Sequence, residues 1–353
     1  MTDNWSACPK TMTYGPCADV GSSGSCEVPM LNGGPGSCVF LHNAPRLEPD
    51  MFAAPTLDPT TDSPRRRRPF IMSELPEDTN SSVNIRRNAR RLAGSVDAVL
   101  FGDANWMRVR FPPSYRARLV KDEGLAAWPG INTRDRNRVA LEGELVALAD
   151  IGVAGVHCVT GNHTHSGNRP DAMPVFDLDS TRLTSLACSL GLTVSVAASP
   201  HTPPTQLRPI RTADKAGAGA SICMVDQPAS ARELSTFITQ TRSIGAASME
   251  FFAVVSIVVD RGDFIRWQQY PNARIPNGWS EEIASARDVE ATGRRLAMSL
   301  SNELLDVPGV SGVVLASLAE PSQSERVADG FASFARELRA ERTNENRDRH
   351  RRM

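Results

Sequence analysis

Four cysteines near the N-terminus are the residues in this chain with the clearest potential for chemistry. Cys8, Cys17, Cys26 and Cys38 lie in a stretch rich in Gly, Pro and Ser, which has too few apolar residues to build a core of its own. Four thiolates can close a tetrahedral metal site, and metal binding then supplies the folding free energy. Their spacing of eight, eight and eleven intervening residues matches neither a zinc-ribbon knuckle nor a ferredoxin pattern. Two interpretations therefore stay open: a zinc or iron–sulfur site, or a metal-free loop segment of reduced thiols.

Composition restricts the class of protein. The chain has 353 residues, of which 41% are hydrophobic, and this is enough for one large globular domain with appendages. A formal net charge of -1 gives no general attraction for nucleic acid or an anionic membrane. The longest apolar run, 251–259, has about half of the ~20 residues that a membrane-spanning helix needs. The N-terminus lacks the apolar stretch of a signal peptide, so we expect a cytoplasmic protein with reduced cysteines.

Changes in composition divide the chain into four regions. Residues 1–46 form the cysteine-rich segment, called the cysteine module below. Residues 47–69 contain five prolines and end in the basic run Arg65–Arg68, which is typical of an extended linker. Residues 70–338 contain the periodic elements of a large domain. Residues 339–353 are mostly charged or polar and predict a disordered tail.

The large domain alternates short apolar runs with amphipathic stretches, which is the pattern of repeated βα units. The expected strands are 70–74, 98–101, 126–131, 155–159, 193–198, 221–225, 250–255 and 312–316. Helix signals lie between them: Asp179 is a typical N-cap, and Gly191 and Gly245 stand where helices should end. Eight such units predict a (β/α)8 TIM barrel with a small N-terminal Cys-rich segment, and the active site at the carboxyl ends of the strands.

Several short strings, in a particular order, indicate a family. They begin with Arg68-Pro-Phe-Ile-Met-Ser-Glu-Leu and continue with Asn132-Thr-Arg-Asp-Arg-Asn-Arg, Val159-Thr-Gly-Asn, Pro170-Asp-Ala-Met-Pro-Val-Phe-Asp and Lys215-Ala-Gly-Ala-Gly-Ala. Over residues 68–318 the chain resembles the methylenetetrahydrofolate reductase family. The cysteine module is similar to a small module found beside or fused to these enzymes, where it is usually C-terminal.

The resemblance implies a role for specific residues. Glu74, at the end of the first strand, matches the family's general acid, which opens the substrate's five-membered ring to give an iminium cation. Asn162 stands where the family has an aspartate that faces this cation. Asp226 falls where the family has a glutamine that recognises the pterin, and Gln227 takes that role if the alignment slips by one residue. A carboxylate at Asp226 could also supply the charge that Asn162 lacks.

The resemblance also bears on cofactors. The family uses NAD(P)H as the hydride source, usually through FAD. Of the family's flavin contacts, the basic residue that meets the pyrophosphate survives as Lys215, while Gly130 stands where a side chain would pack on the flavin ring. We therefore expect little or no FAD, with hydride passing directly from the nicotinamide.

The preferred reading is a reductase that converts 5,10-methylenetetrahydrofolate to 5-methyltetrahydrofolate with a reduced folate bound at the strand ends. One alternative is a folate-dependent transferase that passes the one-carbon unit to another nucleophile. The other is a folate-binding or partner protein without catalysis, in which the cysteine module docks another subunit or a second copy of the chain. Neither nucleic acid nor a membrane is an expected partner.

Overall fold

The computed structural model describes residues 7–30, 33–42, 68–77, 80–102, 109–270 and 272–351, with side chains described as far as residue 344. Eight parallel strands form a closed barrel in chain order, with β1 also pairing with β8. The predicted (β/α)8 TIM barrel is thereby confirmed, and each strand begins and ends within two residues of its predicted bounds. The strands are β1 Phe70–Glu74, β2 Ala98–Phe101, β3 Ala127–Asn132, β4 Val156–Val159, β5 Val194–Ala198, β6 Ile222–Val225, β7 Glu250–Ser256 and β8 Val310–Ala316.

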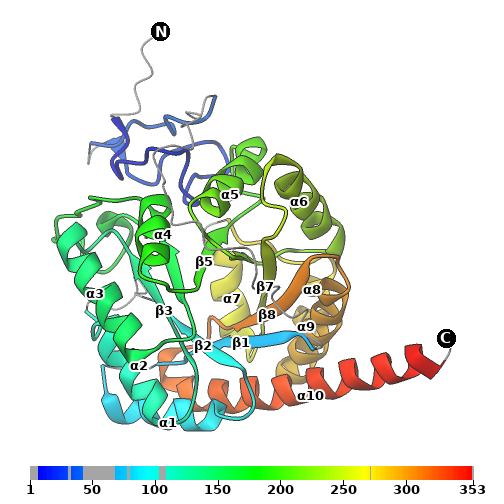
Figure 1. Cartoon of the computed structure of the whole chain (residues 1–353). Helices are drawn as coiled ribbons and strands as arrows, with labels where there is room; N and C mark the ends of the chain where they lie inside the picture. Colours follow the sequence, from blue (N-terminus) through cyan, green and yellow to red (C-terminus); the bar gives the residue numbers. More distant parts are fainter. Residues whose placement is uncertain are drawn as a thin grey trace.

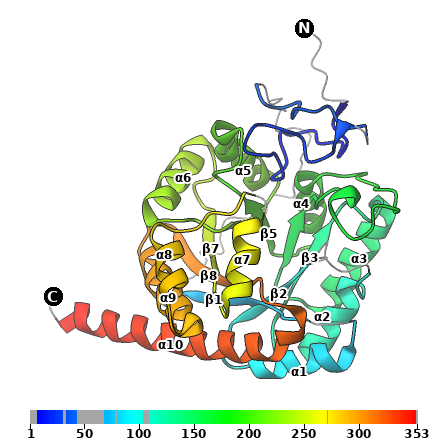
Figure 2. The ribbon, with the colours of Figure 1, turned by 180° about the vertical axis from the view of Figure 1, so that it is seen from behind.

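Helices surround the barrel (Figures 1 and 2). They are α1 Ser82–Leu92, α2 Pro113–Asp122, α3 Arg138–Ile151, α4 Ser180–Ser189, α5 Arg208–Gly217, α6 Ala231–Ile244, α7 Arg261–Gln269, α8 Trp279–Ser285, α9 Val289–Leu305 and α10 Ser324–Arg351. Local chemistry sets several of their ends. Asp179 caps α4 by accepting hydrogen bonds from the backbone N–H groups of Thr181 and Arg182, as expected. Gly152 ends α3 in the left-handed conformation, with φ +69°.

Two apolar layers hold the fold together. Strand residues alone form the inner cluster, which includes Met72, Trp128, Met224 and Phe252 and fills the barrel. The outer and larger cluster joins the other face of the strands to the helices. The indole Nε1 of Trp128 donates a 2.9 Å hydrogen bond to Ser195 Oγ inside the barrel, so its polar atom is satisfied where it is buried.

The C-terminal helix differs from the sequence prediction of a disordered tail from residue 339. α10 continues to Arg351 as one helix of 28 residues. Arg339 forms an ion pair of 2.8 Å with Asp97, and Arg342 forms one of 2.9 Å with Asp306. Two of the charges that suggested disorder, those of Arg339 and Arg342, thus hold the helix against the barrel. In Figures 1 and 2 α10 crosses one end of the barrel, and the cysteine module lies over the other end.

The predicted linker at 47–69 lies mostly outside the described residues, as do Arg65, Arg66 and Arg67. Arg68 is described, and its guanidinium lies 3.1 Å from a carboxylate oxygen of Asp97. Across the described residues, none of the helices has the length and apolar character needed to cross a membrane.

Candidate active site

Two acidic side chains stand at the carboxyl ends of strands, where barrels of this type build their active sites. Glu74 is the last residue of β1, and Asp226 follows β6 directly. Burial raises the pKa of Glu74 to about 7, and the charge of Asp226 adds to the shift. Burial also raises the pKa of Asp226 to about 6, with a further contribution from Asp19. Both carboxyl groups therefore change charge close to neutral pH, which suits proton transfer.

Glu74 also remains accessible to solvent, whereas its neighbours Ser73 and Leu75 are buried. The two properties are compatible, because a group that water can touch on one side is still desolvated by the protein on the others. A backbone hydrogen bond from Ser317 and the charge of Arg110 oppose the shift and are outweighed. Glu74 is thus an acid that is partly protonated near neutral pH and can still contact a bound molecule.

Tyr270, at the end of α7, belongs to the same group. The residue is 47% exposed, but desolvation around its hydroxyl raises the pKa of that group, and the charges of Asp226, Asp19 and Glu74 add to the shift. The phenol therefore keeps its proton at neutral pH and can donate a hydrogen bond to a ligand. Sequence reasoning missed Tyr270, since nothing in its local sequence indicates that it lies near the ends of β1 and β6.

The structure distinguishes the two residues predicted to recognise a pterin. Gln227 Oε1 accepts a 2.6 Å hydrogen bond from Trp267 Nε1. The Gln227 backbone has a φ of +39°, a region that residues other than glycine seldom adopt. Asp226, in contrast, has a carboxylate whose charge acts on both Glu74 and Tyr270. Of the pair, Asp226 is the one that the fold groups with the other ionisable residues.

Asn162 lies in the loop after β4 and points to the cysteine module. Its Nδ2 donates a 2.6 Å hydrogen bond to Oδ1 of Asp19. The preceding Gly161 has a φ of +87°, and a Cβ at this position would lie 3.2 Å from Asn132 Cβ. A larger residue would therefore disturb the turn that places Asn162. The Asn162 amide therefore lies beside a carboxylate, that of Asp19, which belongs to a segment 143 residues earlier in the chain.

Residues 16–20, called the capping segment below, attach the cysteine module to the barrel. Arg208, at the start of α5, donates from a guanidinium nitrogen to Cys17 O at 2.8 Å. Asn272, after α7, donates from Nδ2 to Val20 O at 3.2 Å. Together with the bond between Asn162 and Asp19, these contacts come from the connections that follow β4, β5 and β7. The capping segment therefore spans the end of the barrel where Glu74 and Asp226 stand.

An aromatic contact strengthens this attachment. The ring of the buried Tyr14 has the guanidinium carbon of Arg182 at 5.9 Å and that of Arg211 at 5.7 Å. Arg211 is also held by Asp179, at 3.1 Å. Such cation–π contacts are favourable when the groups are shielded from water. The module is therefore docked on α4 and α5 as well as on the loops.

A buried lysine holds the module together internally. Lys10 is 2% exposed, and its Nζ lies 2.7 Å from Asp19 Oδ2 and also forms an ion pair with Glu27. Burial disfavours its charged form, but the nearby negative groups, above all Asp19, outweigh this effect and raise the Lys10 pKa. Glu27 Oε1 also accepts a 3.0 Å hydrogen bond from His163 N in the β4 loop. One ion-pair cluster thus orients Asp19 and ties the module to the barrel.

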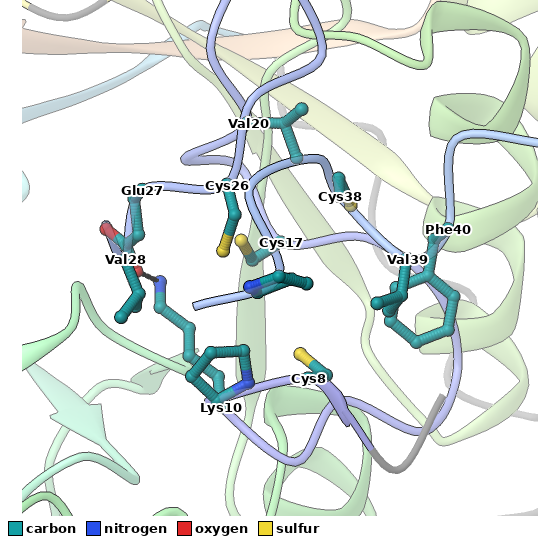
Figure 3. Close-up of a pocket in the computed structure, with 12 residues that line it drawn as sticks. Cys8, Lys10, Cys17, Val20, Cys26, Glu27, Val28, Cys38, Val39 and Phe40 are labelled. Carbon is teal, nitrogen blue, oxygen red and sulfur yellow. Dashed lines mark ion pairs between the residues drawn. The ribbon is translucent and has the colours of Figure 1, made fainter. Parts of the chain in front are cut away.

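The four cysteines of the module line one small cavity of about 20 Å³, together with apolar side chains such as Val20 and Phe40 (Figure 3). A volume of this size accommodates about one small ion or water molecule. Burial is the main cause that raises the pKa of Cys8, Cys26 and Cys38, the last to about 11. This arrangement agrees with the prediction from the sequence that the four thiols come together.

The residues around the cavity fit a bound cation in part. Zinc needs sulfur ligands at about 2.3 Å, and within the described chain no three of the sulfur atoms lie within 4.8 Å of one another, so metal binding would draw them inward. The group that meets this distance is Cys17, Asp19 and Glu27, but both carboxylates already pair with Lys10. The thiols are therefore the available ligands, and metal binding by Cys8, Cys17, Cys26 and Cys38 stays a prediction.

The residues considered for a flavin are Lys215, in α5, and Gly130, in β3. Lys215 is 9% exposed, and its Nζ donates a 2.7 Å hydrogen bond to the carbonyl of Ala197 in β5. Burial lowers its pKa to about 8. At Gly130, a Cβ would lie 3.0 Å from Gly102 Cα, which leaves no room for a side chain that packs on a ring. Pyrophosphate binding by Lys215 stays a prediction.

Comparisons with known proteins support the fold. No protein-family model matches the sequence, and no curated protein matches it. A solved structure of an uncharacterized protein from Clostridium thermocellum, which binds two copies of 5-methyl-5,6,7,8-tetrahydrofolic acid, matches with a TM-score of 0.56 and 13% identity, over 76% of this chain and 96% of that chain. Tryptophan synthase from M. tuberculosis matches with a TM-score of 0.46 and 10% identity, over 76% of this chain and 93% of that chain. At these identities the likeness is one of fold.

Proposed function

We propose that this protein reduces 5,10-methylenetetrahydrofolate to 5-methyltetrahydrofolate with NAD(P)H. The observation that carries the proposal is Glu74, a carboxyl group at a strand end with a pKa raised to about 7 and with solvent access. Such a group is protonated often enough near neutral pH to act as a general acid. The position of Glu74 in the motif that resembles the reductase family agrees with this role.

The chemistry begins with ring opening. Glu74 gives its proton to N10 of the substrate, the bond between N10 and the methylene carbon breaks, and its electron pair stays on N10. The methylene carbon is then an iminium cation on N5. A reduced nicotinamide would supply the hydride that this carbon accepts, and the π pair of the iminium would become the lone pair of N5. One proton and one hydride are consumed for each methyl group formed.

The neighbouring residues have defined tasks in this scheme. Asp226, when ionised, accepts two hydrogen bonds from the amino and ring N–H groups of the pterin. Tyr270 donates a hydrogen bond from its protonated hydroxyl to the bound folate. Asn162 lines the site as a neutral amide that is already engaged with Asp19. The scheme assigns no role to a flavin, so it does not depend on flavin binding by Lys215 or at Gly130.

The structural neighbour from Clostridium thermocellum gives independent support. It binds 5-methyltetrahydrofolate, which is the proposed product, and the match covers 96% of the length of that neighbour. Its low identity makes this support for a reduced folate as ligand class rather than for a reaction. We also propose a structural metal, zinc or an iron–sulfur cluster, at the four cysteines, where it would supply folding free energy to the cysteine module.

The test is a direct assay of the purified full-length chain with reduced folates and each nicotinamide. Oxidation of NADH or NADPH that depends on 5,10-methylenetetrahydrofolate, with one 5-methyltetrahydrofolate formed per nicotinamide, would support the reductase. Loss of the methylene group to a nucleophile without nicotinamide oxidation would favour the transferase. Binding of 5-methyltetrahydrofolate without any turnover would favour a folate-binding protein, and absence of binding would reject the folate proposal altogether.

A further inference from the structure

We infer that Asp19, contributed by the cysteine module, supplies the negative charge that faces the cationic substrate carbon at the barrel site. The inference rests on the proposed function and deepens it, because it makes the module a wall of the active site. A general acid needs no such partner for ring opening, but the cation that follows is stabilised by a nearby fixed negative charge. Asn162, as an amide, does not provide one.

The geometry places Asp19 at the site from two directions. One carboxylate oxygen accepts the 2.6 Å hydrogen bond from Asn162, and the other lies 2.7 Å from Lys10. Its charge acts on Asp226 and Tyr270, which stand at the ends of β6 and α7. The Asp19 side chain is 28% exposed, so these partners do not enclose it and a ligand can approach it.

The ion pair with Lys10 does not cancel this charge. Lys10 carries one positive charge and is shared between two carboxylates, Asp19 and Glu27, while the Arg208 guanidinium is a further positive charge that interacts with Asp19. Glu27 faces the backbone of His163, whereas Asp19 faces Asn162. The negative charge that is directed to the barrel is thus that of Asp19. A charge held in place before the reaction costs no reorganisation when the cation forms.

The capping segment explains how Asp19 is positioned. Hydrogen bonds from Arg208 to Cys17 O and from Asn272 to Val20 O hold the chain on both sides of Asp19. A single residue, Ala18, separates Cys17 from Asp19 along the chain, so the order of the cysteine cavity also restricts the position of the carboxylate. Asp19 is a catalytic residue in this scheme, while Lys10 and Arg208 are positioning residues.

The experiment compares four variants of the full chain: Asp19→Asn, Asn162→Asp, the double variant, and Glu27→Gln as a control for the Lys10 cluster. Asp19→Asn keeps the size of the side chain and removes its charge. It should lower kcat by about 100-fold, the usual weight of one electrostatic contact in a transition state. The fold decrease in kcat caused by Glu27→Gln should be at least tenfold smaller than that caused by Asp19→Asn. In the double variant the amide and the carboxylate exchange places, so at least tenfold of the lost activity should return.

A binding measurement separates charge from folding. 5,10-Methenyltetrahydrofolate is a stable cation that resembles the iminium, and 5-methyltetrahydrofolate is a neutral ligand of similar shape. The measurement is made at mildly acidic pH, where the cation persists. In Asp19→Asn the Kd of the cation divided by the Kd of the neutral ligand should rise about tenfold. In the double variant this ratio should return to the wild-type value. Limited proteolysis of residues 7–42 shows whether the module stays folded in each variant.

The outcomes distinguish the two proposals. A wild-type enzyme with reductase activity and an Asp19→Asn variant that keeps activity within about threefold would overturn the role of Asp19 and leave the proposed function standing. Equal losses in Asp19→Asn and Glu27→Gln without rescue by Asn162→Asp would also overturn it, since disorder of the module would then explain both. A wild-type chain that binds no reduced folate would reject the proposed function, and the role of Asp19 would fall with it.

Discussion

Asn162 Nδ2 and Asp19 Oδ1 lie 2.6 Å apart, although 143 residues separate them in the chain. One belongs to the loop after β4, and the other to the cysteine module. Their hydrogen bond brings a carboxylate to a barrel loop whose own residue is neutral. The cysteine module therefore takes part in the arrangement of charges at the end of the barrel, together with Glu74, Asp226 and Tyr270.

Glu74→Gln tests the general acid. The variant keeps the size and hydrogen bonding of the side chain but has no proton to transfer. We expect the Kd for 5-methyltetrahydrofolate to change by less than about threefold and kcat to fall by about 100-fold or more, the usual contribution of general acid catalysis. Steady-state kinetics and calorimetric titration measure the two quantities separately. Unchanged turnover would remove Glu74 from the mechanism.

The pH profile of kcat/KM should be bell-shaped and narrow. Glu74 must be protonated, so activity declines as the pH rises through about 7. Asp226 must be ionised to accept hydrogen bonds from the pterin, so activity declines as the pH falls through about 6. Because the two groups interact, the observed limbs describe the pair. In Glu74→Gln the residual activity should lose its alkaline limb, and a profile that keeps this limb would assign it to another group.

Asp226 and Gln227 can be separated by matched substitutions. Asp226→Asn keeps the shape of the side chain but replaces one acceptor oxygen with a donor NH2 and removes the charge, so the bidentate pair with the pterin is lost and we expect the Kd for reduced folate to rise about tenfold or more. Gln227→Asn retains an amide and a residue type that tolerates positive φ. Since Gln227 is engaged by Trp267, this change should alter the Kd by less than about threefold. The reverse order of effects would identify Gln227 as the pterin-binding residue.

The metal prediction concerns the cysteine cavity. The purified protein should contain about one zinc ion or one cluster per chain, as measured by elemental analysis and absorption. Cys26→Ser should release this metal and make residues 7–42 sensitive to protease, because metal binding supplies local folding free energy. The melting temperature of the barrel should change little, since its two apolar layers do not include the module. A metal-free wild-type protein with a protease-resistant module would show that docking on the barrel suffices to order it.

The strands and the position of Glu74 could be predicted because they depend on local patterns. Apolar runs of four to seven residues define the strands, and parallel strands necessarily place their carboxyl ends at one edge of the barrel. Asp179 capped α4 as expected, since an N-cap needs contacts within three residues. The prediction of a disordered tail failed at α10 for the opposite reason. Its ion pairs join Arg339 to Asp97 and Arg342 to Asp306, and such partners cannot be recognised in a charged run alone.

The composition of the site was decided by the tertiary structure. The sequence by itself determined that an acid ends the first strand, that an amide follows the fourth, and that four cysteines stand together near the N-terminus. Only the folded chain decided that Asp19 lies beside Asn162, that Tyr270 joins the acids, and that Trp267 engages Gln227. The physical reason is that local periodicity specifies which face of an element is buried, whereas contacts between distant segments depend on how the module docks on the barrel loops. The raised pKa values of Glu74 and Asp226 likewise follow from burial in the folded chain, with added contributions from charges far away in the sequence, Asp226 acting on Glu74 and Asp19 acting on Asp226.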